Sequence, residues 1–411
     1  MPEREEISEL QLLEKRLSQQ CELVLGSRNA AIYDFQQDNV YSLNESARAV
    51  LLGTQKDATS FWNRLEAMGL AETTKTNTPP SETLLNIPQV GLEFMWLELT
   101  NRCNERCLHC YASAGEFNDQ NEELGIIQWE KVIEDGRNLG CKRLQFIGGE
   151  PLLVKGIFDL AETAKQLDYE IVEIYTNGIL LTEAKIQRIK DLGLQIAISL
   201  YSIVPELHDA VTQVPGSFNK TFRALEQLKE AGIPTRVGII AMRQNEKVVQ
   251  DTLFQMQQMG FTSSKIDVLR PTGRGICIDH LPSRETLQTY ALLTKPNFRA
   301  DRNSFTRNKH WNSCWAGKIT VSATGDVIPC IFARNHVVSN IVSGLEDAIY
   351  NDNLQTLWKI TKDSVATCKD CEYRYGCSDC RPLSEDTYGN LYAKNPRCTY
   401  NPYSGQWRNE L

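Results

Sequence analysis

From residue 90 onward the sequence alternates short strand-like runs with helical stretches, and this alternation limits the fold more than any other feature. Four of the five gaps between the runs hold a clear apolar helical period, as in IIQWEKVIEDGRNL and TFRALEQLKEAG. Repeated strand–helix units predict a parallel sheet, either open or curved into a partial barrel. Functional side chains in such folds lie on loops at the carboxyl ends of the strands. The strand-like runs are FMWLEL, RLQFIG, IVEIYT, LQIAISLY, TRVGIIA and KIDVLR.

Three cysteines, Cys103, Cys107 and Cys110, follow the first of these runs directly in the stretch CNERCLHC. Three thiols are too many for one disulfide and one short of a tetrahedral zinc site. Three thiolates on one loop can hold a cubane iron–sulfur cluster and leave one iron open to another molecule. The alternatives are a zinc site completed by His109 or a redox-inert loop, but ligation by adjacent residues would strain so tight a loop. The sequence therefore favours a cluster with an open iron.

The stretch TNRCNERCLHCY resembles the radical S-adenosylmethionine (SAM) superfamily, whose signature is C-x3-C-x2-C. The resemblance implies that the amino and carboxylate groups of SAM bind the open iron. It also implies that an electron from an external reductant, such as a flavodoxin or ferredoxin, cleaves SAM to a 5′-deoxyadenosyl radical, which abstracts hydrogen from a substrate. The sequence alone identifies no catalytic acid or base.

Further motifs end the later strands, and the resemblance places them around SAM. In the family GGEP binds the ammonium group, polar residues after strands three and four lie near the ribose and carboxylate, and His109 leans toward the adenine. The plain alternatives are turns and solvated strand ends, and a β-turn is the plain role of PTGR at 271–274. The predicted SAM-contact residues are His109, Gly148, Gly149, Glu150, Pro151, Thr176, Asn177, Ser199 and Tyr201.

Seven more cysteines lie between residues 314 and 398. Their spacing is similar to the SPASM extension of radical SAM enzymes, which implies two auxiliary clusters and three [4Fe-4S] clusters in all. The pattern departs from the family where only Ser378 and Asp379 separate two cysteines, since the family usually has three residues there. A structural zinc knot is the alternative, but one zinc would use four of the seven thiolates.

By analogy with SPASM ligation, these cysteines divide into an outer set of four and an inner set of three, so the inner cluster lacks a fourth cysteine. The outer set is Cys368, Cys371, Cys377 and Cys398, and the inner set is Cys314, Cys330 and Cys380. Three isolated cysteines are interpreted as small apolar side chains, namely Cys21, Cys141 and Cys277. Of these, Cys277 could instead complete the inner site.

The pattern of residues 18–72 predicts a small module. In it, AAIYDF and VYSL form the two strands of a hairpin, and QQDN forms the turn between them. Asn44 is placed to cap the helix that follows, and TKTNTPPS has the composition of a linker. The module resembles the PqqD-like peptide recognition element, which binds leader segments of ribosomally made peptides. Such binding adds a strand to the hairpin edge. A packing or dimerisation domain is the alternative.

We therefore predict an α/β chain of three regions. Residues 1–80 form a winged-helix-like, PqqD-like recognition element, residues 81–295 a partial (β/α)6 barrel of radical SAM type, and residues 296–411 a Cys-rich SPASM domain. The formal net charge of −8, without a basic block, argues against nucleic-acid and membrane partners. No signal segment and no run of 18 apolar residues occurs, so we expect a cytoplasmic protein whose 13 cysteines stay reduced.

Taken together, the resemblance points to a radical SAM maturase of a ribosomally synthesised precursor peptide. Its product would be a thioether, carbon–carbon or ether cross-link. The alternatives are an oxidase of Cys or Ser of the sulfatase-maturating type, a peptide epimerase, or a non-enzymatic iron–sulfur electron carrier. Turnover of SAM to 5′-deoxyadenosine distinguishes the maturase from the carrier.

Overall fold

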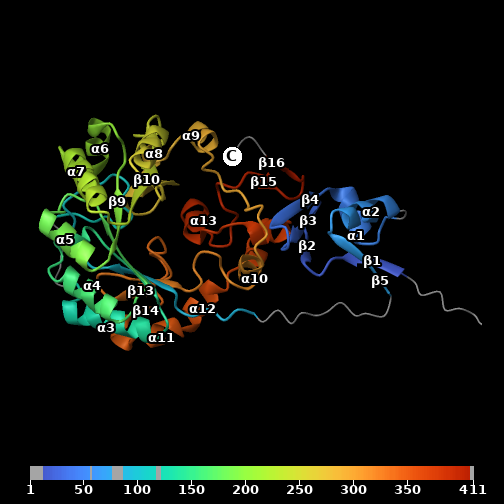
Figure 1. The fold of residues 1–411 in the computed structure, drawn as a ribbon, viewed down its shortest axis with the longest axis horizontal. Helices are drawn as coiled ribbons and strands as arrows, with labels where there is room; N and C mark the ends of the chain where they lie inside the picture. Colours follow the sequence, from blue (N-terminus) through green and yellow to red (C-terminus); the bar gives the residue numbers. More distant parts are fainter. Residues whose placement is uncertain (1–12, 56–57, 76–86, 117–121, 408–411) are drawn as a thin grey trace, which may run out of the picture.

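The computed structural model describes residues 13–55, 58–75, 87–116 and 122–407. Figure 1 shows a small N-terminal module at one end of the chain, a strand–helix barrel at the other, and the C-terminal region between them. Residues 76–86, which contain most of the predicted linker, lie outside the described ranges.

The core of the barrel is a nine-stranded sheet in the order β11-β10-β9-β8-β7-β6-β12-β13-β14. Strands β6 to β11 pair in parallel along the sheet, which confirms the predicted parallel α/β fold. All six strands coincide with the strand-like runs of the sequence. Their bounds are β6 Phe94–Glu98, β7 Arg143–Ile147, β8 Ile171–Thr176, β9 Gln195–Ser199, β10 Thr235–Ala241 and β11 Lys265–Val268.

Helices fill the gaps between these strands and cover one face of the sheet (Figure 1). Their apolar faces join the outward side chains of the strands in the main hydrophobic core. Because strand side chains alternate between faces, the intervening residues point into the barrel. The helices are α3 Ile126–Asn138, α4 Ile157–Gln166, α5 Glu183–Asp191, α6 Pro205–Thr212, α7 Ser217–Glu230 and α8 Val249–Gln258.

The C-terminal region contributes three strands to the same sheet, which the sequence analysis did not predict. Strand β12 (Lys318–Val321) pairs in parallel with β6, while β13 (Asp326–Ile328) and β14 (Ser339–Asn340) continue antiparallel. These strands have two to four residues, too few to show a period of two. The predicted boundary at residue 296 is therefore not a boundary of the sheet.

The rest of the C-terminal region consists of short helices and a two-stranded β15–β16 pair around the cysteine-bearing loops. The α-helices are α9 Arg284–Thr289, α10 Arg302–His310, α11 Leu345–Ile349, α12 Asp352–Trp358 and α13 Arg381–Tyr388. The strands are β15 Tyr400–Asn401 and β16 Gln406–Trp407. Short 3-10 turns occur both between the barrel strands and in the C-terminal region. They are η1 Pro151–Leu153, η2 Gly273–Ile276, η3 Ile278–His280, η4 Ile341–Ser343, η5 Lys362–Ser364, η6 Cys368–Asp370 and η7 Arg374–Gly376.

The N-terminal module contains the predicted hairpin, formed by β3 (Ala30–Asp34) and β4 (Asn39–Leu43). The side chain of Asn44 accepts a hydrogen bond from the Ala47 amide at the start of α1, as predicted. A further strand, β2, pairs with β3 and makes the sheet three-stranded. The other elements are β2 Cys21–Leu25, α1 Glu45–Leu51, α2 Thr59–Ala67 and the paired strands β1 Leu13–Leu17 and β5 Ala71–Lys75. Strand β5 occupies the start of the predicted linker, so that part of the linker prediction is wrong.

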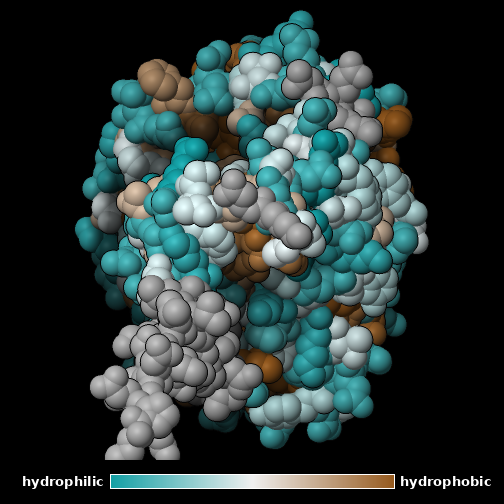
Figure 2. Space-filling model, turned by 90° about the vertical axis from the view of Figure 1, so that its right-hand side faces the viewer, coloured by the Kyte–Doolittle hydropathy of each residue, from teal (hydrophilic) through white to brown (hydrophobic). Residues whose placement is uncertain are grey.

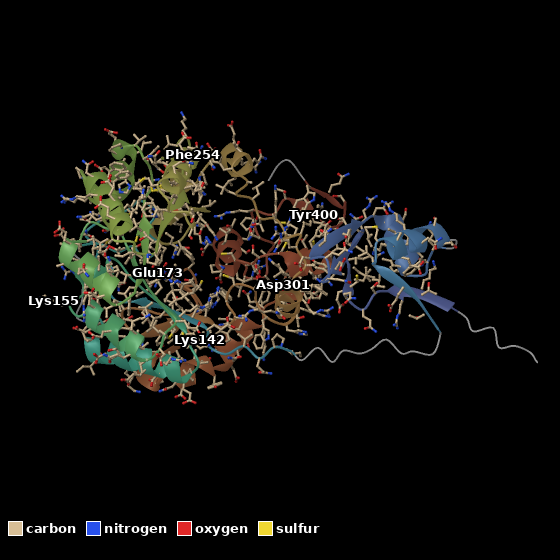
Figure 3. The ribbon with its side chains drawn as sticks, viewed as in Figure 1. Lys142, Lys155, Glu173, Phe254, Asp301 and Tyr400 are labelled. Carbon is tan, nitrogen blue, oxygen red and sulfur yellow. The ribbon has the colours of Figure 1, made fainter. Side chains whose placement is uncertain are left out.

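The three-stranded sheet of this module is covered on both faces. One face packs against α2 around Ile32 and Leu65, and the other packs against the C-terminal region around Tyr33 and Phe305. Tyr400, labelled in Figure 3, joins the second cluster at the junction of the two regions. A large apolar contact therefore fixes the module to the region that carries the seven C-terminal cysteines.

A buried ionic group lies where the sequence departs from the SPASM spacing. The carboxylate of Asp379 accepts hydrogen bonds from Lys362 Nζ at 2.9 Å and from Arg381 Nε at 2.7 Å, and all three residues are buried. Asn312, two residues before Cys314, donates to the other carboxylate oxygen at 3.3 Å. Asp379 therefore connects the loops that carry the inner and outer thiols.

We expect Asp379→Asn to destabilise the fold by about 3–5 kcal/mol, because it leaves two buried cations without their counter-charge. The matched control is Asp363→Asn, since Asp363 is half-exposed and pairs with Arg374; an exposed pair of this kind contributes about 0–1 kcal/mol. Thermal unfolding of both variants measures the difference. Equal unfolding midpoints for the two variants would contradict the stabilising role of Asp379.

The described helices include none that is both long enough and apolar enough to cross a lipid bilayer. Figure 2 views the molecule from the end that carries the N-terminal module. On this face hydrophilic residues predominate, and hydrophobic residues lie in separate small patches.

Candidate active site

A cavity of about 810 Å³ runs from the loop of Cys103, Cys107 and Cys110 into the barrel and along β10 and β11. The thiol loop follows the carboxyl end of β6, where the sequence predicted a site. Among the predicted SAM-contact residues, seven line the cavity: His109, Gly148, Gly149, Thr176, Asn177, Ser199 and Tyr201. Its volume lies in the range of small-molecule sites and leaves room for more than one ligand group.

The three thiols line the cavity, and all three cysteines are partly buried. Burial raises the pKa of Cys103 to about 12 and raises that of Cys107 well above its usual value. A backbone N–H donates to the Cys103 sulfur and another to the Cys110 sulfur, each at 3.4 Å. Buried thiols become thiolates when a bound metal supplies the compensating charge. The loop therefore fits a metal-bearing group that binds thiolates.

The two glycines after β7 hold this loop in place. Gly149 N donates to Thr100 O at 2.7 Å, and Glu150 N donates to Arg102 O at 2.8 Å. A Cβ on Gly149 would overlap the Arg102 carbonyl, and one on Gly148, whose φ is +144°, would lie 2.5 Å from Thr100 O. The close approach that two glycines allow is therefore made by the backbone of the thiol loop.

We expect Gly149→Ala to displace the loop and to remove the iron bound there, about four irons per chain for one cubane cluster. The control is Gly91→Ala, because no described atom lies within 4 Å of a Cβ at that position. Iron analysis of anaerobically purified protein compares the two. A Gly149→Ala protein with its full iron content would contradict the packing role of this glycine.

Glu150 connects the ends of neighbouring strands. Its fully buried carboxylate accepts hydrogen bonds from Thr176 Oγ1 at 2.7 Å, the Asn177 amide at 2.9 Å and the Leu152 amide at 3.0 Å. Asn177 in turn donates to Asn104, inside the thiol loop, at 2.8 Å. In this arrangement Glu150 orients the residues that face the cavity. Pro151 is buried and starts the η1 turn that follows.

Aromatic groups cover the other side of the thiol loop. The Tyr201 hydroxyl lies 4.0 Å from the Cys107 sulfur, and its ring contacts the His109 ring edge-to-face at 4.6 Å between centroids. Burial, with the nearby Arg274, lowers the pKa of His109 to about 3, so the imidazole is neutral at pH 7. Tyr201 also shares a hydrogen bond with Ser199. No three His, Cys, Asp or Glu side chains in the described ranges gather tightly enough to share a single metal ion.

The PTGR segment lies against the thiol loop. Arg274 donates to the carbonyl oxygens of Cys107 and Ala114, both at 2.8 Å. A Cβ on Gly273 would lie 2.5 Å from the Cys110 carbonyl oxygen, and Gly273 has a φ of +60°. The segment forms the η2 turn, and its contacts show that it also braces the site.

Several cavity residues were missed by the sequence analysis. Glu105 lies within the thiol loop with one carboxylate oxygen 3.2 Å from the Cys107 sulfur. Deeper in the barrel, Arg236 donates to both oxygens of Glu173, which also pairs with Gln145; Figure 3 labels Glu173. Gln145, Glu173 and Arg236 occupy inward positions of β7, β8 and β10, and their alternation with apolar neighbours was the signal that could have identified them. Glu105 lies on the loop, where no such alternation marks it.

The seven C-terminal thiols influence one another electrostatically. Burial raises the pKa of Cys330 to about 12, and the charges of Cys314 and Cys380 raise it further. Burial likewise raises the pKa of Cys377 to about 12, with contributions from Cys398 and Cys368; Cys371 interacts with Cys377 and Cys368. The division into an inner and an outer set stays a prediction, and Cys277 is exposed.

Comparison with known proteins gives three main similarities. Residues 97–256 match the family model of the Radical SAM superfamily. An AdoMet-dependent heme synthase of Methanosarcina barkeri is 24% identical over 337 residues, covering 74% of this chain and 95% of the relative. A PqqA peptide cyclase of Granulibacter bethesdensis is 25% identical over 346 residues, covering 77% and 88%.

Among solved structures, SuiB of Streptococcus suis bound to its precursor peptide SuiA superposes with a TM-score of 0.59 at 15% identity. The superposition covers 93% of this chain and 99% of SuiB. The likeness at this identity is one of fold. The chain therefore contains a radical SAM domain and is an enzyme, for which the family implies SAM and a [4Fe-4S] cluster.

Proposed function

We propose that this chain is a radical SAM maturase that forms a cross-link in a ribosomally synthesised precursor peptide. The observation that carries the proposal is the cavity, which joins the three-thiol loop to the barrel interior and continues to the C-terminal region at Phe332. Such a space accommodates SAM at the thiol end and a peptide side chain beyond it. The PqqA cyclase likeness and the fold shared with the peptide-bound SuiB support a peptide substrate.

The cluster and SAM, when bound, supply an electron and a reactive carbon radical. The chain's own residues hold and shield this chemistry. Cys103, Cys107 and Cys110 bind the cluster, and Gly148, Gly149 and Glu150 fix the loop. The remaining contact residues, His109, Thr176, Asn177, Ser199 and Tyr201, orient SAM in a space from which water is excluded. Pro151 starts the turn that supports them.

Two auxiliary clusters form the second part of the proposal. The grouping of the outer four and inner three thiols supports two separate sites over one zinc knot. Buried thiols in such numbers fit iron–sulfur ligation, because the thiolate form requires a compensating metal charge. An external flavodoxin or ferredoxin would supply electrons, and we place the enzyme in the cytoplasm, where such donors are found.

Metal analysis tests this part of the proposal. Anaerobically purified protein is expected to contain about 12 irons with equal acid-labile sulfide, from three cubane clusters. About 4 irons accompanied by zinc would show a zinc site in the C-terminal region and would contradict the auxiliary clusters.

The N-terminal module is proposed to bind the leader of the precursor peptide at the outer edge of β2. The β4 edge is partly covered, because Val40 N donates to Phe298 O at 3.0 Å and the Ser42 hydroxyl bonds with Tyr373. At the ends of β2, Phe35 N donates to Gln20 O and Gly26 N donates to Asn29 O. These bonds show that the backbone N–H and C=O groups of the even-numbered β2 residues point toward β3. The N–H and C=O groups of the odd-numbered β2 residues therefore point outward. Two of these groups are already used, because Leu25 O accepts from Arg374 Nη1 at 2.9 Å and Cys21 N donates to Ser18 O at 2.8 Å. Within the described ranges the Leu23 N–H has no backbone partner. A peptide strand can bind there through its main chain.

A further inference from the structure

Arg270 lines the cavity and interacts electrostatically with the inner thiol set, Cys314, Cys330 and Cys380. It follows β11 and lines the cavity beside Phe332, two residues after Cys330. Its guanidinium carbon lies 4.5 Å from the centroid of the Phe332 ring, and its Nη2 donates to Asp267 at 3.2 Å. The stacking and the ion pair fix the plane of the guanidinium group.

The two remaining donor atoms of this group are not used. Nε and Nη1 of Arg270 are buried and have no hydrogen-bond partner among the described residues. Buried polar atoms are nearly always paired, because leaving a donor unsatisfied costs its desolvation free energy. A fixed arginine with two unpaired donors therefore indicates an acceptor that binds beside it.

The surroundings of Arg270 identify that acceptor. Burial would lower the pKa of Arg270, but the negative charges of Cys380, Asp267 and Cys314 outweigh burial and raise it. The neighbouring Arg397 is already engaged, because it donates to the carbonyl oxygens of Val268 and Leu269. Arg270 therefore combines two buried, unpaired donor atoms with an electrostatic interaction with the inner thiols, whose sulfur atoms are the acceptors that fit it.

We infer that Arg270 donates N–H···S hydrogen bonds to the inner auxiliary cluster and holds the reduction potential of that cluster high. The inference rests on the proposed function, since it requires a cluster on the inner thiols. Reduction adds negative charge to a cluster, so a cation and hydrogen bonds at its sulfur atoms stabilise the reduced form. Because Arg270 also lines the cavity, it connects the inner cluster to the substrate space.

The test uses full-length protein in which Cys103, Cys107 and Cys110 are replaced by alanine, so that the auxiliary clusters alone titrate. Redox titration followed by electron paramagnetic resonance measures both midpoint potentials. With Arg270→Met we expect one potential to become more negative, and the ratio of reduced to oxidised cluster at a fixed ambient potential to fall about tenfold, equivalent to about 59 mV for one electron. Arg270→Lys keeps the charge without the planar fork and should give a smaller shift in the same direction.

The control is Arg236→Met, which removes a cation from the same cavity whose guanidinium is already paired with Glu173. It should leave both potentials unchanged. In the protein with Arg270 intact and 15N-arginine incorporated, the reduced inner cluster should show a 15N coupling in pulsed resonance spectra. This measurement does not depend on the folding of a variant.

Each of three results would overturn the inference. The first is that Arg270→Met leaves both potentials unchanged, the second is that it shifts both potentials equally, and the third is that the reduced inner cluster shows no 15N coupling. In those cases the iron remains, and the proposed auxiliary clusters stand. A background protein that contains no iron at all would overturn the auxiliary clusters and the role of Arg270 together.

Discussion

Replacing Cys103, Cys107 and Cys110 together by alanine is expected to abolish the formation of 5′-deoxyadenosine from SAM. The reason is that, among the described residues, no other thiols line that end of the cavity. The two C-terminal thiol sets lie on other loops, so their iron should remain, and the iron content should fall from about 12 to about 8 per chain. Product analysis by chromatography and iron analysis of the same preparation check both parts.

The matched control for this variant is Cys277→Ala. Cys277 is exposed on the surface and lies outside all three thiol groups. Its removal should change neither the iron content nor the yield of 5′-deoxyadenosine. Full 5′-deoxyadenosine formation in the triple variant would show that the radical chemistry has been assigned to the wrong thiols.

The second large effect concerns the leader peptide. Leu23→Pro removes the outward N–H of β2, and proline is tolerated in an edge strand when its nitrogen faces outward. We expect the affinity for the precursor peptide to fall at least about tenfold, which corresponds to about 1.4 kcal/mol, because the added strand loses a main-chain bond. Fluorescence anisotropy with a labelled leader measures the change.

The same substitution on the opposite edge serves as the control. Ser42→Pro removes an outward N–H of β4, where the C-terminal region already covers part of the edge. Peptide affinity should be retained in this variant. The reverse result is weak peptide binding by Ser42→Pro and unchanged binding by Leu23→Pro. It would show that the leader binds at the β4 edge.

Point variants are better suited to this question than deletion of residues 1–80. The contact between Tyr33 and Phe305 belongs to an apolar cluster shared by the module and the C-terminal region. Removing the module would expose that cluster. A loss of activity in the truncated chain would then reflect damage to the C-terminal region as well as the missing peptide site.

The sequence was sufficient for the parts of the fold that have long, regular patterns. Six strands of four to seven residues alternate with helices, so the hydrophobic period of the sequence changes clearly from one element to the next, and the structure contains all six. The helix cap at Asn44 depends on one side chain and its neighbours, and it also formed as predicted. Local chemistry determines such features, so they can be recognised without the tertiary structure.

The remaining elements depend on contacts between distant segments. Strands β12 to β14 become strands because β6 offers them an edge, and β5 forms by pairing with β1 across more than fifty residues. The same holds in the site. Nothing local to Gly149 shows that the Arg102 backbone will lie against it, and nothing local to Arg270 shows that thiols from three loops will surround it.

The central claim is that a radical made from SAM at the thiol loop takes hydrogen from a peptide. Its most direct test is mass spectrometry of the 5′-deoxyadenosine formed anaerobically from SAM, a reductant and a deuterated candidate precursor peptide. We predict that the 5′-deoxyadenosine carries deuterium from the peptide and that the peptide loses hydrogen as its cross-link forms. Formation of 5′-deoxyadenosine without deuterium, at the same rate with and without the peptide, would contradict the claim.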